Sequence, residues 1–162
     1  MPKRQKHIRF ATWNINSVRI RTHLIEKCVV DHNPDIICLQ ETKCTNDQFP
    51  EKFFRKLGYE HIALTGMKGY HGVATVSRIP FDDVQTKEFC GKGDTRHIMT
   101  RICGDVDLHN FYVPAGGDVP DRETNEKFDH KLNFLKEMTA WFKGKRNKTR
   151  NKYILVGDLN IA

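Results

Sequence analysis

The sequence lacks the features of membrane-spanning, secreted and repetitive proteins. No apolar run approaches the roughly 20 residues that a transmembrane helix needs, so we expect no membrane contact. The basic residues 1–6 lead into a predicted strand rather than into an apolar leader, and we expect no signal peptide. No repeat or low-complexity linker divides the 162 residues, which we interpret as one domain spanning residues 1–162.

Cysteine does not occur in the patterns that build disulfide frameworks or zinc sites. The five cysteines are odd in number and scattered, and they include no Cys-x-x-Cys pair. This distribution favours a reducing, intracellular (cytoplasmic) compartment and argues against a zinc site. The composition, 38% hydrophobic and 29% charged, is that of a globular chain.

Acidic residues are missing from two basic segments, and these segments account for the net charge of +7. Six basic residues fall within ten positions: Lys143, Lys145, Arg146, Lys148, Arg150 and Lys152. Without this run the net charge is +1, and without Lys3, Arg4 and Lys6 as well it is −2. Because the basicity is local, we favour a solvated loop and a frayed terminus over a DNA contact for these segments.

Three short apolar runs end directly on acidic or amide side chains. The runs are predicted strands at residues 8–13, 36–40 and 153–157. The side chains that follow them are Asn14 and Asn16, Glu41, and Asp158 and Asn160. A carboxylate directly behind a buried strand needs a metal, a cation or a nearby surface, because burying it alone is costly.

The first two strands enclose a predicted helix. Ser17 is a candidate N-cap, and Ile20, Leu24 and Cys28, together with Ile25 and Val29, follow helical spacing. The helix should end before Pro34. Strand, helix and strand form a βαβ unit of ordinary size, so the two strands should be parallel, with Asn14 and Glu41 at one edge of the sheet.

The middle of the chain predicts a short helix and several β-strands. The helix covers residues 50–57, with Phe53, Phe54 and Leu57 facing inward and Gly58 ending it. Short β-rich segments follow at residues 61–64, 72–77, 84–89, 97–103 and 106–113, and we expect them to pair mostly antiparallel.

The longest helical pattern covers residues 121–143, with Phe128, Leu132, Leu135, Met138 and Phe142 on one face. A helix of about twenty residues is roughly 30 Å long, so the basic run at its end should lie far from the site edge. The strand at residues 153–157 then returns the chain to that edge. Trp13 and Trp141 are expected in the core.

Oxygen-bearing side chains without cysteine or clustered histidine are the ligands of a hard cation such as Mg²⁺ or Mn²⁺. Lys43, Arg19 and Lys68, with the amides of the glycine-rich loop 66–72, would supply the positive side of a phosphate-binding cleft. Tyr70 and Tyr112 offer hydroxyl groups or stacking faces. Together these residues indicate metal-assisted attack of water on a phosphoester.

Five motifs in order resemble those of the exodeoxyribonuclease III and apurinic/apyrimidinic endonuclease family, within the endonuclease/exonuclease/phosphatase superfamily. They are Thr12–Asn16, Pro34–Lys43, Gly69–Ala74, Phe111–Pro114 and Gly157–Ala162. The resemblance implies an α/β (α+β) fold, the N-terminal part of a four-layered α/β sandwich with mixed sheets. It also implies magnesium-dependent hydrolysis of double-stranded DNA beside abasic sites in base excision repair, with 3′–5′ exonuclease activity.

The resemblance also implies roles for individual residues. Glu41 matches the metal-binding Glu of the family, and Asn14 and Asn16 match the polar residues beside it. Tyr112 matches the active-site Tyr, Asp158 the Asp that orients or deprotonates the attacking water, and Asn160 its phosphate-contacting neighbour. Arg19, Lys43, Tyr70 and His71 fall where relatives touch the DNA backbone.

The chain departs from the family in its extent, because it corresponds to about the first three fifths of such an enzyme. The Asp-His pair that relatives carry near the C-terminus has no counterpart, and none of the eight histidines lies in a matching motif. We interpret His71, His97 and His109 as ordinary strand or loop residues. We expect the C-terminal half of the fold to be missing, an apolar face to be exposed, and the chain alone to be inactive without a complementary fragment.

Each predicted site residue also has a purely structural interpretation. Glu41 could pair only with Lys43 or Arg19, Asp158 and Asn160 could form a turn, and Tyr70 and Tyr112 could be packing residues. Two other functions stay open as well. The chain could be a non-catalytic remnant that binds DNA or a partner, or a phosphatase of the same superfamily acting on a small or lipid phosphate.

Overall fold

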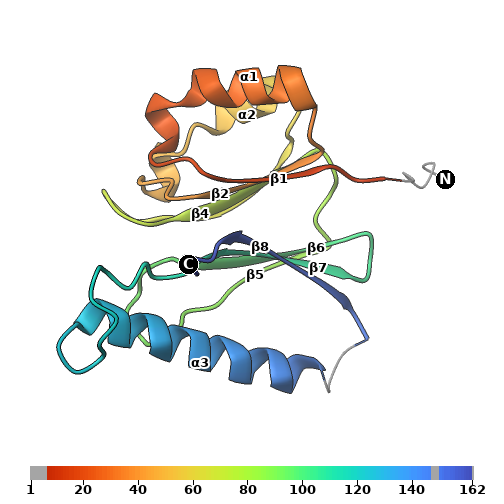
Figure 1. Ribbon diagram of the computed structural model, residues 1–162. Coiled ribbons are helices and arrows are strands. Elements are labelled where there is room, and N and C mark those ends of the chain that lie inside the picture. The colour runs from red at the N-terminus through yellow and green to blue at the C-terminus, as the bar shows by residue number, and fades with distance from the viewer. Residues whose placement is uncertain (1–6, 147–149, 162) are drawn as a thin grey trace.

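The computed structural model describes residues 7–146 and 150–161. Two four-stranded sheets pack face to face, and helices cover the outer face of each, which gives the four layers in Figure 1. The prediction of a mixed α/β sandwich is therefore confirmed. No helix in the described ranges is long and apolar enough to cross a bilayer.

The first sheet has the strand order β1-β2-β4-β3. Its strands are β1 (Phe10–Asn14), β2 (Ile36–Gln40), β3 (His61–Thr65) and β4 (Val73–Ser77). As predicted, β1 and β2 are parallel, and the register places Asn14 beside Gln40, the residue before Glu41. The other two pairings, β2 with β4 and β3 with β4, are antiparallel.

The helix between β1 and β2 begins later than predicted. A short 3₁₀ helix, η1 (Val18–Ile20), precedes α1 (Thr22–His32), and Ser17 has a φ of 83° and makes no capping hydrogen bond with its side chain. The N-cap assignment was wrong because the backbone of Ser17 is committed elsewhere: its N–H donates to the Glu41 carbonyl at 2.8 Å. Ile20 and Leu24 are consequently exposed, whereas Ile25 and Val29 are buried as predicted.

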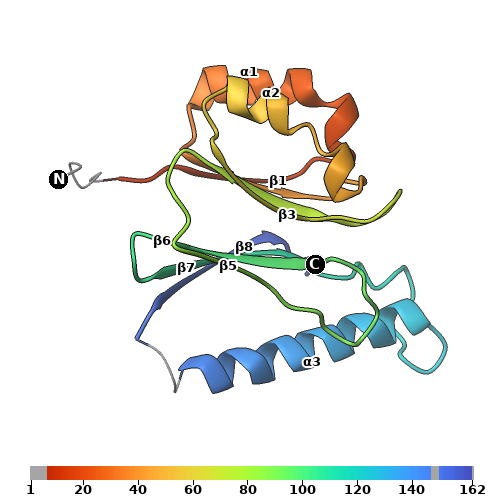
Figure 2. The same cartoon turned by 180° about the vertical axis from the view of Figure 1, so that it is seen from behind.

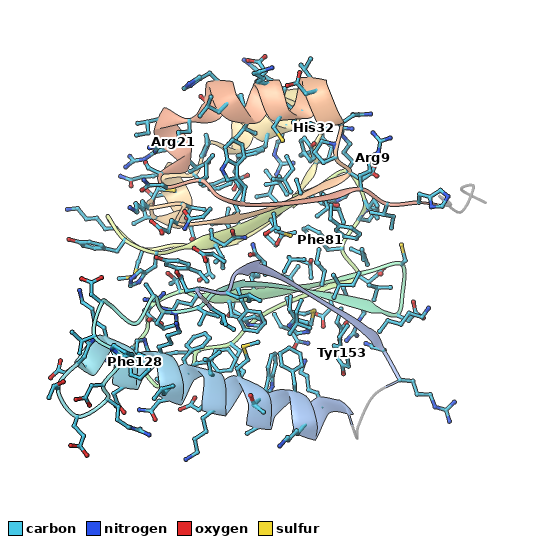
Figure 3. The ribbon with its side chains drawn as sticks, viewed as in Figure 1. Arg9, Arg21, His32, Phe81, Phe128 and Tyr153 are labelled. Carbon is cyan, nitrogen blue, oxygen red and sulfur yellow. The ribbon has the colours of Figure 1, made fainter. Side chains whose placement is uncertain are left out.

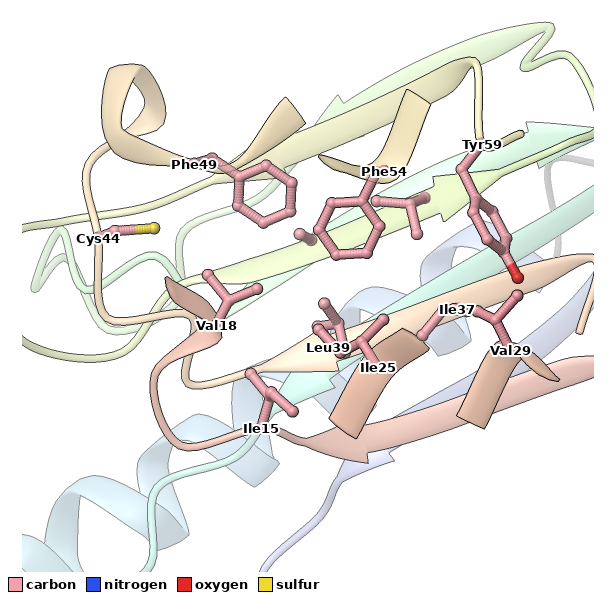
Figure 4. Packing of buried hydrophobic residues seen from close by; sticks show 12 residues of the cluster. Ile15, Val18, Ile25, Val29, Ile37, Leu39, Cys44, Phe49, Phe54 and Tyr59 are labelled. Atoms are coloured by element: carbon pink, nitrogen blue, oxygen red, sulfur yellow. The ribbon is translucent and has the colours of Figure 1, made fainter. Parts of the chain in front are cut away.

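The end of α1 and the next helix follow the predictions. Asn33, in the left-handed conformation, ends α1 directly before Pro34. A short 3₁₀ helix, η2 (Asn46–Gln48), leads to α2 (Glu51–Lys56). Phe54 of α2 is fully buried, and Phe53 and Leu57 pack against the same cluster of apolar side chains. Figure 4 shows this cluster, in which both helices meet the outer face of the first sheet.

The second sheet has the order β5-β6-β7-β8, with strands β5 (Asp83–Thr86), β6 (His97–Ile102), β7 (Val106–Tyr112) and β8 (Lys152–Asp158). β5–β6 and β6–β7 are antiparallel, and β7–β8 is parallel, with Tyr112 opposite Asp158. The prediction that the middle strands pair mostly antiparallel is confirmed.

α3 (Glu126–Arg146) runs along the outer face of the second sheet (Figure 2). It begins five residues later than predicted because residues 121–125 form a turn, in which Asn125 accepts a hydrogen bond from the Lys127 N–H at 3.1 Å. The far end of α3 lies away from the C-terminal residues, as Figure 1 shows. The basic run begins there, although its residues 147–149 lie outside the described part of the chain.

The space between the sheets is filled by apolar side chains and one buried polar network. Ile36, Cys38, Ile102 and Leu108 form one apolar cluster there, and Phe81 packs against it (Figure 3). In the network, Gln40 of the first sheet donates to Asn110 Oδ1 of the second at 2.8 Å. Asn110 Nδ2 in turn donates to the carbonyls of Leu39 and Ala74 at 3.1 and 3.0 Å. These directional bonds fix how the two sheets are aligned.

The strands β1 and β8 lie at the edges of their sheets and against each other on one side of the sandwich. β8 is less buried than its neighbour β7, and apolar side chains in and after it are exposed: Leu155, Leu159 and Ile161. Trp13 of β1 and Trp141 of α3 are partly buried and pack against core clusters, as expected.

Candidate active site

The carboxylates of Glu41 and Asp158 are joined through one side chain. Asn14 Nδ2 donates to Glu41 Oε1 at 2.7 Å and to Asp158 Oδ2 at 2.8 Å. Asn14 ends β1 and Glu41 follows β2 in the first sheet, whereas Asp158 ends β8 in the second. The predicted strand ends therefore meet at one edge of the sandwich, and the site spans both sheets.

Glu41 accepts hydrogen bonds on both carboxylate oxygens. The Tyr112 hydroxyl donates to Oε1 at 2.8 Å, and Lys43 Nζ lies 3.0 Å from Oε2. Burial alone would raise the pKa of Glu41, but the bonds from Asn14, Lys43 and Tyr112 outweigh burial and hold that pKa below its ordinary value. Glu41 is therefore ionised at neutral pH and presents a negative charge at the site.

Tyr112 is held as a neutral hydrogen-bond donor. Burial, and next the bond to Glu41, raise the pKa of Tyr112 to about 12. The phenol therefore keeps its proton at neutral pH and directs it at Glu41. Its ring lies 5.9 Å from the ring of His71, which belongs to the glycine-rich loop.

Asp158 and Asn160 form the turn that follows β8. Asp158 Oδ1 accepts the Asn160 N–H at 3.1 Å, and Asn160 Nδ2 donates to the Val113 carbonyl at 2.8 Å. The turn interpretation of these residues and their place beside Glu41 are thus compatible. Lys131 of α3 donates to the Asn160 carbonyl at 2.5 Å and so ties this turn to the helix.

Gly157 is required for Asp158 to lie beside Tyr112. Its φ is 132°, and a Cβ at this position would lie 1.9 Å from the Phe111 carbonyl oxygen. No side chain fits between the two strands at that distance, so the close approach of β7 and β8 depends on glycine.

Backbone strain is concentrated around the site. Five non-glycine residues there have φ values between 45° and 54°: Asn16, Glu41, Lys43, His71 and Asn160. Such conformations cost on the order of 1–3 kcal/mol each, and they persist only where surrounding contacts enforce them. Here the loops hold one another: the Thr42 N–H donates to the Gly72 carbonyl at 3.2 Å and the Lys43 N–H to the His71 carbonyl at 3.0 Å.

The remaining predicted residues lie at different distances from this centre. Asn16 Oδ1 accepts a hydrogen bond from Lys43 at 2.6 Å, which places Asn16 one side chain away from Glu41. Tyr70 is 68% exposed and its ring lies 6.2 Å from that of His71. Arg19 and Lys68 are exposed, and within the described ranges no hydrogen bond or ion pair joins either to Glu41 or Asp158.

Two partly buried cations beside the site were not predicted from the sequence. Arg96 stacks on the Tyr112 ring, with Cζ 4.8 Å from its centroid, and Lys131 supports Asn160 as described above. Neither lies in a recognisable motif. Lys131 could have been found from the sequence, because its spacing from Phe128 and Leu135 places it on the inward face of the predicted helix.

An open groove of about 670 Å³ borders Asp158 and Asn160. The start of α3 and the loop before it form its other wall, with Gly117, Phe128 and Lys131 among the lining residues. The edge that carries the joined carboxylates is therefore accessible to a ligand larger than a water molecule.

The donor set at this edge fits a hard cation only in part. The described residues contain no group of three His, Cys, Asp or Glu side chains that could enclose a metal. Glu41, Asp158 and the amide oxygens of Asn14 and Asn16 are nevertheless oxygen donors, and Mg²⁺ keeps several waters beside one or two carboxylates. The set therefore suits an open magnesium-type site and does not suit zinc.

Solved structures with the same fold include nucleic-acid enzymes. An AP endonuclease from Archaeoglobus fulgidus is 33% identical, with a TM-score of 0.81 over 96% of this chain and 58% of its own. A 3′ phosphatase from Neisseria, bound to a product DNA hairpin, is 31% identical, with a TM-score of 0.84 over 96% of this chain and 59% of its own.

Sequence comparison gives the same grouping. Exodeoxyribonuclease III of Haemophilus influenzae is 29% identical over 96% of this chain and 58% of its own length. The chain thus spans less than two thirds of these relatives. The model of the Endonuclease/Exonuclease/phosphatase family matches residues 11–162. The chain belongs to the endonuclease/exonuclease/phosphatase family.

Proposed function

We propose that the chain carries part of the active site of a divalent-metal-dependent DNA phosphodiester hydrolase of the exodeoxyribonuclease III type. The observation that carries the proposal is the Asn14 amide shared by Glu41 and Asp158, at 2.7 and 2.8 Å. It brings together, from two sheets, a carboxylate for a metal and a carboxylate for water. The names of the relatives support DNA as the substrate.

In this proposal the charge and position of each residue determine its role. Glu41 and Asn16 would hold Mg²⁺ or Mn²⁺, which supplies charge neutralisation and polarisation of a phosphoryl oxygen when bound. Asp158 orients or deprotonates the attacking water, and Asn14 holds Asp158 next to Glu41. Tyr112 and Asn160 contact the phosphate; the high pKa of Tyr112 keeps it protonated, and its single proton would turn from Glu41 to the phosphate when substrate binds.

Double-stranded DNA with an abasic site is the proposed ligand. Lys43 and His71 lie at the site, whereas Arg19, Lys68 and Tyr70 are exposed around it. Exposed cations and a tyrosine ring of this kind suit the DNA backbone, because phosphate contacts position a duplex without reading its sequence. All five cysteines are free thiols, which accords with the proposed reducing, intracellular compartment.

The chain spans about three fifths of the length of its relatives. Relatives are longer by about two fifths of their length, and β8 leaves apolar side chains exposed. We therefore propose that full activity needs a complementary segment, which belongs either to the same polypeptide or to a second one. A 3′ phosphatase on DNA ends is the second candidate function, favoured by the Neisseria relative.

The test combines cleavage and metal binding. The chain would be incubated with a duplex containing one abasic analogue, with and without Mg²⁺, and separately with a 3′-phosphorylated duplex and an inositol phosphate. Glu41→Ala should abolish nicking and weaken Mn²⁺ binding measured by electron paramagnetic resonance. Glu51→Ala is the matched control, because Glu51 is a glutamate on α2, away from the site, that pairs with Arg55 at 3.3 Å.

Three outcomes separate the alternatives. Metal-dependent nicking lost in Glu41→Ala supports the proposal, and phosphate release from the 3′ end or from the inositol phosphate assigns the phosphatase functions instead. Equal Mn²⁺ binding by Glu41→Ala and the unaltered chain, without cleavage of any substrate, would falsify the assignment of this edge as a catalytic site.

A further inference from the structure

Arg96 is a largely buried arginine, and two of its three side-chain hydrogen bonds reach residues of the candidate site. It precedes β6, and its side chain is only 9% exposed. Nη1 donates to the Tyr112 carbonyl at 3.3 Å, and Nη2 lies 3.1 Å from His71 Nε2. Nε pairs with Asp94, and the guanidinium covers the Tyr112 ring with Cζ 4.8 Å from the centroid.

These contacts connect three separate parts of the chain. His71 belongs to the glycine-rich loop, Tyr112 ends β7, and Asp94 also lies 3.3 Å from His130 of α3. The backbone contributes too, since the Tyr112 N–H donates to the Arg96 carbonyl at 2.8 Å. Because Nε, Nη1 and Nη2 all bind protein groups, the guanidinium is engaged in holding its neighbours rather than open to a substrate.

The contact with His71 also determines where that imidazole carries its proton. A guanidinium has only donors, so His71 Nε2 must act as the acceptor and the proton must reside on Nδ1. Burial, and next the charge of Arg96, lower the pKa of His71, so its ring is neutral at pH 7. Arg96 therefore sets the tautomer of a residue beside Tyr112 and, together with burial, keeps its ring neutral.

We propose that Arg96 is a positioning residue for the active site, which clamps the Tyr112 ring and sets the tautomer of His71. This inference rests on the proposed function, because it assigns meaning to the position of Tyr112. A lysine cannot replace this arginine fully, since three nitrogens in a plane are needed to reach Asp94, His71 and the Tyr112 carbonyl together.

The structural part of the proposal is tested by nuclear magnetic resonance without any substrate. Nitrogen-15 spectra of histidine report the tautomer of His71, and aromatic shifts report the ring of Tyr112. We expect Arg96→Met to lose the Nδ1–H preference of His71 and to shift the Tyr112 ring signals. Arg96→Lys, which keeps the charge but has a single donor nitrogen, should restore the His71 signal in part, and it takes over the test if Arg96→Met does not fold.

A matched control is available in the first sheet. Arg78 covers the ring of Tyr59 with Cζ 4.7 Å from its centroid and donates to Asn33 Oδ1 at 2.5 Å, in the same manner but away from the site. Arg78→Met should change the signals of Tyr59 and leave those of Tyr112 and His71 as they are. Unchanged His71 and Tyr112 signals in the Arg96 variants would overturn the proposal.

Kinetics test whether the positioning matters. Where the chain nicks abasic DNA, Arg96→Met should lower kcat by roughly 10²-fold with little change in KM, since a displaced catalytic group reduces rate rather than binding. A changed His71 tautomer with unchanged kcat would refute the positioning role. If the unaltered chain neither nicks DNA nor binds Mn²⁺ through Glu41, the proposed function fails, and the spectra then decide the Arg96 contacts on their own.

Discussion

Glu41 and Asp158 accept hydrogen bonds from the same nitrogen atom, Asn14 Nδ2. This amide keeps two carboxylates close together by giving each a donor, where they would otherwise repel each other. One side chain therefore offsets the repulsion between the two carboxylates, and substitution of Asn14 is the most direct test of the arrangement.

Asn14→Ala should destabilise the protein by about 2 kcal/mol, because hydrogen bonds to charged groups contribute more than neutral ones and two are lost together. The measurement is the free energy of unfolding in urea at pH 7.5. Asn133→Ala is the control: Asn133 donates to Asp129 at 2.9 Å on α3, and its loss should change stability by less than about 0.5 kcal/mol. Equal effects of the two variants would contradict this interpretation.

Gly157→Ala should prevent or severely weaken folding. The new Cβ would lie 1.9 Å from the Phe111 carbonyl oxygen, and the β7–β8 pairing would have to open to admit it. Gly144→Ala in α3 provides the contrast, since no atom lies within 4 Å of its added Cβ and alanine favours a helix. We expect that variant to gain about 0.5–1 kcal/mol. Thermal unfolding of both variants checks the pair, and a normal melting temperature for Gly157→Ala would show that the strands can separate without cost.

Stability should fall as the pH is lowered from 6.5 towards 4. Burial lowers the pKa of His97 to about 2 and that of His109 to about 4, and the two rings share a bond at 2.9 Å. The unfolded chain therefore binds protons in this range that the folded chain does not, and protonation favours unfolding. At pH 5 one such histidine costs roughly 2 kcal/mol relative to pH 7.5.

Urea unfolding at pH 7.5, 6 and 5 measures this slope. Replacing both His97 and His109 by leucine should flatten most of it, with His71, whose pKa burial also lowers, supplying the remainder. His23→Leu, at an exposed position on α1, should leave the slope unchanged. A double variant as pH-sensitive as the unaltered chain would show that other groups govern acid unfolding.

Lys43→Met should strengthen Mn²⁺ binding in the absence of DNA. Lys43 Nζ lies 3.0 Å from Glu41 Oε2, so the ammonium competes with any cation for that oxygen. A partly exposed ion pair contributes about 1 kcal/mol, which corresponds to a gain in affinity of roughly fivefold. Titration followed by electron paramagnetic resonance provides the dissociation constants, with Lys52→Met on α2 as the control. Weaker binding in Lys43→Met would mean that Lys43 supports the metal site instead of competing with it.

The sequence was sufficient to predict the strands and the edge at which they deliver their polar residues. Each of β1, β2 and β8 is an apolar run that stops at Asn14, Glu41 or Asp158, and the parallel pairing of β1 and β2 follows from the helix between them. This edge can be located from the sequence because the apolar runs identify the strands, and a strand-helix-strand unit places its two strands parallel.

The contacts that required the structure are those set by tertiary packing. Ser17 has a good capping side chain, yet its backbone is recruited by Glu41, a residue distant in sequence, and α1 begins at Thr22 instead. Arg96 follows no periodicity, and its importance arises because β6, β7 and the glycine-rich loop converge on it. Local preference does not determine such positions, because partners from three segments do.

Finally, the polar bonds between Gln40 and Asn110 make the site sensitive to sliding of one sheet over the other. Asn14 and Glu41 travel with the first sheet, and Tyr112 and Asp158 with the second. A slip of one residue along a strand, about 3.3 Å, would break the bonds that cross between the sheets, from Asn14 to Asp158 and from Tyr112 to Glu41. A substitution in the buried interface between the sheets can therefore inactivate the site without contacting it. The alignment of the two sheets is what holds the site residues within bonding distance of one another.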